Sequence, residues 1–86
     1  MSQKVITGLE NIAKEAGAAD AVKLEAAIKG TREALKQEKG SALLSQLDQE
    51  LDVWQKKITV IVGEPAGRQG VAKHAHYWVE TLKNKG

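Results

Sequence analysis

One stretch of the chain, residues 41–63, constrains the fold more than any other. It reads SALLSQLDQELDVWQKKITVIVG, and its apolar side chains recur at alternating steps of three and four residues: Leu44, Leu47, Leu51, Trp54, Ile58 and Ile61. This spacing puts all six side chains on one side of an α-helix. It is also the spacing at which helices pack side by side. The stretch therefore predicts a helix buried along one side, in a bundle of helices.

The same pattern recurs in three other segments, each with four apolar or small side chains on one side of a helix. They are Val5, Leu9, Ile12 and Ala16; Leu24, Ile28, Thr31 and Leu35; and Val71, Ala75, Trp78 and Leu82. Short connections between such segments favour antiparallel neighbours. We therefore predict an all-α fold, with residues 1–86 forming one small antiparallel bundle of four helices. The expected helices are 3–16, 20–38, 41–62 and 71–84.

Individual residues mark where these helices begin, end and approach each other. Asp20 and Ser41 are good N-caps for the second and third helices. Gly17 is expected to end the first helix, because glycine is common just after a helix C-terminus. Gly8 lies near the edge of the first apolar side, where the absence of a side chain would let a neighbouring helix approach closely.

Residues 58–62, Ile-Thr-Val-Ile-Val, leave two interpretations open. A run of β-branched residues favours a strand locally, and a strand followed by a glycine-rich loop at residues 63–70 would resemble an anion-binding arrangement. The segment lacks the Gly-Lys-Ser/Thr ending of a P-loop, however, and residues 1–57 offer no second strand. Helix is therefore the favoured prediction for residues 41–62, with residues 63–70 as a connection.

The composition limits the possible environments of the chain. Its 86 residues include no cysteine, which excludes disulfides and thiolate metal sites. The first residues lack the apolar core of a signal peptide, and no apolar run approaches the ~20 residues of a membrane span. We therefore expect a cytoplasmic protein that does not interact with membranes.

The titratable residues give no pattern of an enzyme or a metal site. His74 and His76 are two residues apart, so they point in nearly opposite directions on a helix and cannot share one ion. No Ser-His-Asp or Cys-His arrangement is evident. We therefore expect no catalytic residue, no cofactor, no metal and no small-molecule substrate.

A protein-interaction or regulatory role, with self-association, is the leading hypothesis. Val53 and Val60 lie seven residues apart, opposite the apolar side of the 41–62 helix, where polar residues would be expected. A chain slightly longer than roughly 70–80 residues has a small core of its own, and oligomerisation is a common remedy. Both valines are therefore candidates for contact with another protein or with a second copy in a homodimer.

Nucleic-acid binding is the alternative hypothesis. The net charge is only +2, but basic residues gather toward the C-terminus, with one aromatic residue among them: Arg68, Lys73, His76, Tyr77 and Lys83. Basic side chains can bind phosphates, and an aromatic ring can stack on a base. Glu80 lies in the middle of this face, which weakens the hypothesis.

Overall fold

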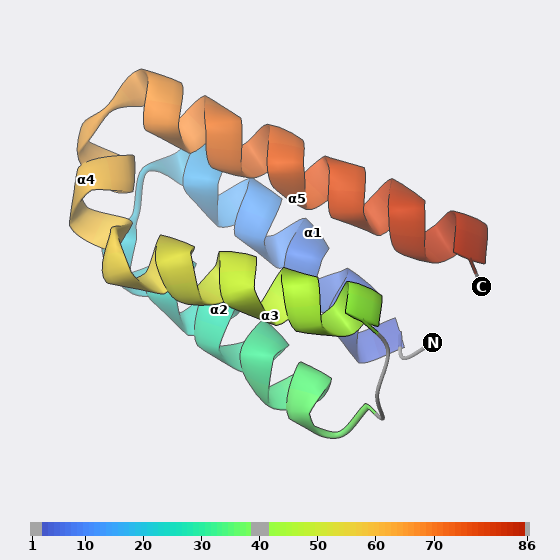
Figure 1. The fold of residues 1–86 in the computed structure, drawn as a ribbon. Helices are drawn as coiled ribbons and strands as arrows, with labels where there is room; N and C mark the ends of the chain where they lie inside the picture. Colours follow the sequence, from blue (N-terminus) through green and yellow to red (C-terminus); the bar gives the residue numbers. More distant parts are fainter. Residues whose placement is uncertain (1–2, 39–41, 86) are drawn as a thin grey trace.

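A computed structural model of the chain describes residues 3–38 and 42–85 (Figure 1). Within these ranges five helices follow one another: α1 (Gln3–Ala18), α2 (Ala21–Lys36), α3 (Ala42–Lys56), α4 (Ile58–Gly63) and α5 (Pro65–Lys85). No strand occurs in these two described ranges. The predicted all-α bundle is confirmed, with five helices where four were expected.

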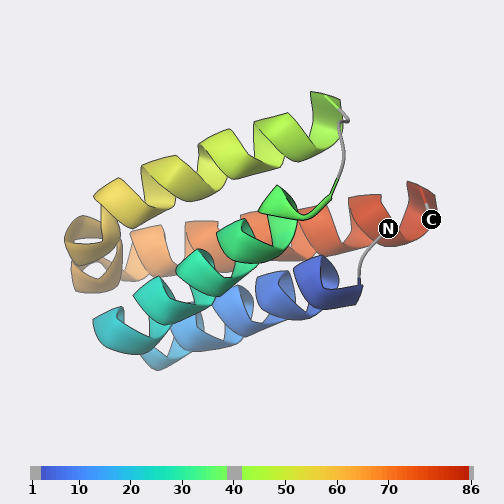
Figure 2. The same cartoon turned by 90° about the horizontal axis from the view of Figure 1, so that it is seen from below.

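The helices form a bundle in which α1 is the central element of one layer. It packs against α2 on one side and against α5 on the other, and these are the two most extensive helix contacts. Helix α3 packs mainly on α2, and short α4 turns the chain across one end of the bundle, against α5. Figure 2 shows α3 along one edge of the bundle, with a wider gap between it and α1 than between α1 and α2.

The core is a single cluster built from the apolar sides predicted above. Every member of the α1 and α5 sets is buried, and so are all four of the α2 set. In the 41–62 segment Leu47, Leu51, Trp54 and Ile61 are buried, and Leu44 and Ile58 pack half-buried against the cluster. Because burying a Leu or Ile side chain stabilises a fold by roughly 1.5–3 kcal/mol, this cluster is the main source of stability.

The contact between α1 and α2 depends on Gly8. A Cβ atom built on Gly8 would overlap Oγ1 of Thr31, on α2, and would lie 3.1 Å from the Cβ of that residue. Thr31 is itself buried, and its hydroxyl donates a hydrogen bond to the carbonyl oxygen of Ala27 at 2.8 Å. The predicted close approach of a neighbouring helix at Gly8 is thus confirmed.

One predicted helix boundary is confirmed and another is wrong. Asp20 caps α2, because its side chain accepts a hydrogen bond from the backbone N–H of Lys23 at 3.0 Å. Helix α1 does not stop at Gly17 but continues to Ala18, and the left-handed residue after it is Ala19, with φ 58°. The chain reversal at Ala19 therefore occurs two residues later than predicted.

The predicted helix 41–62 is interrupted at Lys57, which separates α3 from α4. The break turns the chain at the end of the bundle, and α4 then brings Ile61 back into the core. Residues 58–62 are therefore helical, and the strand alternative is wrong.

Residues 63–70 are not the connection that the sequence predicted. Only Glu64 lies between α4 and α5, in an extended conformation, and Pro65 is the first residue of α5. Proline suits the first helical position and favours an extended conformation in the preceding residue. Because residues 65–70 are the first turns of a helix, the glycine-rich nucleotide-binding loop does not exist.

Candidate interaction surface

Glu50 connects α3 to α5 through two contacts. Its Oε2 accepts a hydrogen bond from the indole Nε1 of Trp78 at 2.6 Å, and its Oε1 lies 3.4 Å from Nδ1 of His74. Trp78 is buried, whereas the His74 side chain is largely exposed. The Glu50 carboxylate therefore accepts a hydrogen bond from the buried Trp78 indole. It also contacts the exposed His74, at the edge of the α3–α5 contact that faces solvent.

The aromatic side chains gather at this contact. Trp54 of α3 lies 6.5 Å from His74 between ring centroids, in a tilted arrangement. Tyr77 lies 6.0 Å from Trp78, edge to face, and such pairs are favourable geometries. These are all the Trp and Tyr residues of the chain, which has no Phe. We refer to Glu50, Trp54, His74, Tyr77 and Trp78 together as the α3–α5 seam.

The outer edge of the α3–α5 seam is apolar and basic. Tyr77 is 63% exposed, although it is one of only three aromatic residues in the chain. Lys73, His74 and Tyr77 line a shallow groove of about 350 Å³. Val53, 46% exposed, lies one helical turn from Glu50 and therefore on the same side of α3. An exposed aromatic ring beside a groove is typical of a binding surface.

A second cluster of charges links α3 to α2. The Arg32 guanidinium donates to Asp48 at 3.0 Å, to Asp52 at 3.1 Å and to the Gln55 side chain at 2.9 Å. The hydrogen bond with Asp48 raises the pKa of Arg32. The hydrogen bond from Lys56, with support from Arg32, lowers the pKa of Asp52. These groups pair with one another and hold the two helices in register.

The five residues of the predicted basic face are not brought together as a free basic surface. Arg68 is half-buried, and its Nη1 donates a hydrogen bond to the carbonyl oxygen of Val62 at the end of α4. Nζ of Lys83 lies 3.9 Å from a carboxylate oxygen of Glu10 on α1. Lys73, His76 and Tyr77 are exposed on α5. Two of the four basic residues thus have structural partners within the chain.

Val53 and Val60 are both exposed, at 46% and 59%. The prediction placed them on one face of a single helix. The interruption at Lys57 assigns Val53 to α3 and Val60 to α4, so the seven-residue spacing no longer aligns them. Their role in contact with another protein stays a prediction for each valine separately.

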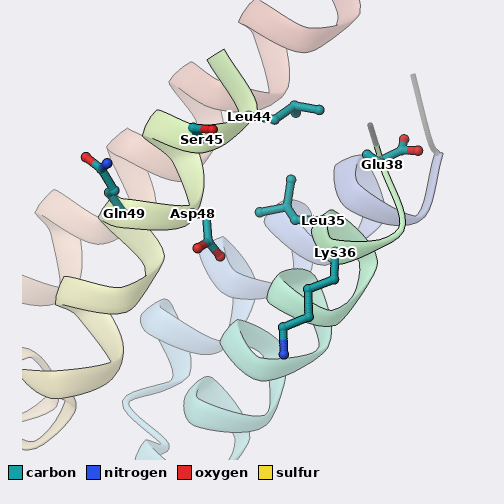
Figure 3. A pocket seen from close by; sticks show the side chains of 7 residues that line it. All are labelled: Leu35, Lys36, Glu38, Leu44, Ser45, Asp48 and Gln49. Atoms are coloured by element: carbon teal, nitrogen blue, oxygen red, sulfur yellow. The ribbon is translucent and has the colours of Figure 1, made fainter. Parts of the chain in front are cut away.

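A further groove of about 350 Å³ opens between α2 and α3 (Figure 3). Leu35 and Leu44 extend into the gap from the two helices, and Lys36, Asp48 and Gln49 lie around it. Residues 39–41, which join α2 to α3 at this end and include the predicted cap Ser41, lie outside the described residues. The groove is therefore not a defined site.

The described residues hold no group of three or more His, Cys, Asp or Glu side chains placed for a metal ion. In the same ranges, no helix is both long and apolar enough to cross a membrane.

The sequence prediction missed Glu50 and the contact that it makes with His74. A signal for both was present, because each lies four residues before a tryptophan: Glu50 before Trp54 and His74 before Trp78. Residues four apart are neighbours on a helix. Two helices that bury their tryptophans in the same core can therefore bring these polar residues together as well.

No protein-family model matches this chain, and neither a curated protein nor a solved structure is significantly similar to it.

Proposed function

We propose that this chain is a non-enzymatic helical protein-interaction module that self-associates through the outer edge of the α3–α5 seam. The observation that supports this most is the exposure of Tyr77 beside the groove that it lines with Lys73 and His74. Aromatic residues are enriched at protein interfaces, where they supply large contact areas at a low cost in conformational entropy.

The surroundings of Tyr77 support the same proposal. The 2.6 Å hydrogen bond from the Trp78 indole to Glu50 joins α5 to α3 beneath the Tyr77 ring. This hydrogen bond holds the surface on which the ring lies. Val53 extends the apolar surface across α3. A rigid anchor with apolar surroundings loses little freedom on binding, which favours association.

Nucleic-acid binding has less support. Arg68 and Lys83 contact Val62 and Glu10, so phosphates would compete with internal partners for two of the basic side chains. This alternative predicts binding to DNA or RNA that weakens steeply with salt. Absence of any complex at low salt would exclude it.

Sedimentation equilibrium over a wide range of protein concentrations tests self-association. We expect the mass of the wild-type chain to rise with concentration, and the variant Tyr77→Ser to associate at least about tenfold more weakly, as for a central aromatic residue of an interface. The exposed Val22 of α2 provides the matched control, because Val22→Ser also removes an exposed apolar side chain. The variants Val53→Lys and Val60→Lys, measured singly, show how much each valine contributes to the strength of self-association.

A wild-type mass that stays at 9.3 kDa throughout would rule out the proposed self-association. Equal weakening by Tyr77→Ser and Val22→Ser would show that the contact is not located at the α3–α5 seam.

A further inference from the structure

The exposed face of α5 carries two opposite charges in a self-complementary arrangement. Lys73 and Glu80 are both exposed and seven residues apart, so they lie on the same side of the helix, separated by two turns. Tyr77 lies between them, four residues after Lys73 and three before Glu80. Within the described part of the chain, neither charged side chain has an ion-pair or hydrogen-bond partner.

We propose that a second copy of this chain packs its α5 antiparallel to the first across a two-fold axis near Tyr77, pairing Lys73 of each copy with Glu80 of the other. The inference rests on the self-association proposed above and names the face that carries it. In a two-fold contact the same patch serves both subunits, so each pairing occurs twice.

In an antiparallel pair of identical helices, the numbers of two residues that lie opposite each other always have the same sum. One pair of opposite residues therefore fixes all the others. With the axis between residues 76 and 77, residue 73 of one copy lies opposite residue 80 of the other. The same register places Gln69 opposite Asn84, and both of these amide side chains are exposed. Amides can donate to and accept from each other. One register therefore gives complementary partners to both the charged pair and the amide pair.

The alternative orientation of the helices is unfavourable. A parallel pairing in register would place Lys73 against Lys73 and Glu80 against Glu80, and like charges in contact are destabilising. Gly70 lies one turn before Lys73 and has open space around its Cα, so the second helix can approach closely there. Charge complementarity thus favours the antiparallel arrangement, and the glycine leaves room for it.

The face is also accessible in the folded chain. Helix α5 lies at one side of the bundle and α2 at the other (Figure 1). Within the described part of the chain, α5 packs against α1 and α4 and contacts Glu50 and Trp54 of α3. The exposure of Lys73, Tyr77 and Glu80 shows that no other described element covers this outer face.

Charge reversal tests the pairing by sedimentation equilibrium at low salt. Lys73→Glu places a glutamate opposite Glu80 in both pairs, and Glu80→Lys places two lysines together in both. We therefore expect each variant to associate at least about tenfold more weakly than the wild type. The double variant Lys73→Glu/Glu80→Lys restores both pairs and regains association.

The control is Lys29→Glu, which makes the same change of net charge at an exposed lysine of α2. It should associate like the wild type. Circular dichroism verifies that all variants keep their helix content, as expected for exposed positions.

The outcomes separate this inference from the proposed function. A wild-type chain that associates while both single variants match it would overturn the α5 pairing and leave self-association to another face. Weakening by Lys29→Glu equal to that of Lys73→Glu would also overturn it, because net charge would then explain the effect. A wild-type chain that is monomeric at every concentration would overturn the proposed self-association itself.

Discussion

At the scale of single residues, two glycines inside helices have opposite roles. Gly8 is in α1, where Thr31 of α2 fills the space that a Cβ would need. Gly30 is in α2 and exposed, and a Cβ added to it would meet nothing within 4 Å. One glycine is required by packing, and the other only weakens its helix.

Alanine substitutions at the two glycines should therefore change stability in opposite directions. Gly30→Ala should stabilise the fold by up to about 1 kcal/mol, the difference in helix propensity. Gly8→Ala gains the same propensity but forces a contact that costs about 1–3 kcal/mol, so we expect net destabilisation. Thermal unfolding measures both, with a shift of about 4–8 °C for each kcal/mol in a domain of this size. A rise in melting temperature for Gly8→Ala would contradict the close helix contact.

At the scale of helices, α3 is attached through polar links on two sides. Arg32 of α2 forms ion pairs with Asp48 and Asp52 of α3. On the other side, Glu50 of α3 accepts a hydrogen bond from Trp78 of α5. The buried side chains of Leu47 and Leu51 complete its attachment to the core. The orientation of α3 thus depends partly on charges whose ionisation can be changed by pH.

Acid should weaken the charge interactions of Asp52 with Lys56 of α3 and with Arg32 of α2. The hydrogen bond from Lys56, together with Arg32, lowers the pKa of Asp52 in the folded chain. An unfolded aspartate has a pKa of about 3.9, so the ionised group contributes its full stability above about pH 4 and loses it as the pH falls through the lower folded value.

Thermal unfolding of the wild type and of Asp52→Asn at a series of pH values measures this contribution. We expect the wild type to be the more stable protein at neutral pH and the difference to shrink as the solution becomes acidic. A difference that is independent of pH would mean that the Asp52 charge does not stabilise the fold.

At the scale of the whole molecule, packing is uneven. Helix α1 approaches both α2 and α5 closely, whereas α3 stands further out and contacts mainly α2 (Figure 2). Elements with fewer close contacts open at lower free energy than the rest of the fold. Helix α3 is therefore the first of the long helices expected to open.

Native-state hydrogen exchange should reveal this order. Backbone amides in the middle of α3 should exchange through an opening of lower free energy than those of α1 and α5. The measurement is amide exchange by NMR at several low denaturant concentrations. Equal opening free energies in all three helices would show that the bundle unfolds as one cooperative unit.

The sequence by itself determined which residues form the core. The three-four spacing of apolar residues requires a buried side on each helix, and helices α1, α2 and α5 bury the predicted residues without exception. Local chemistry also determined single boundaries, such as the cap at Asp20. These features depend on residues close together in the chain, so a single sequence is sufficient to predict them.

Only the tertiary structure decided where the third helix breaks and which polar residues meet. The turn at Lys57 has no signal in the three-four spacing, which continues without a break through Trp54, Ile58 and Ile61. The contact of Glu50 with His74 and Trp78 depends on the register between α3 and α5. Register is set by segments far apart in the chain. The spacing of Glu50 and His74 from their tryptophans marks two polar residues that can meet, but it does not determine the register of α3 on α5 that brings them together.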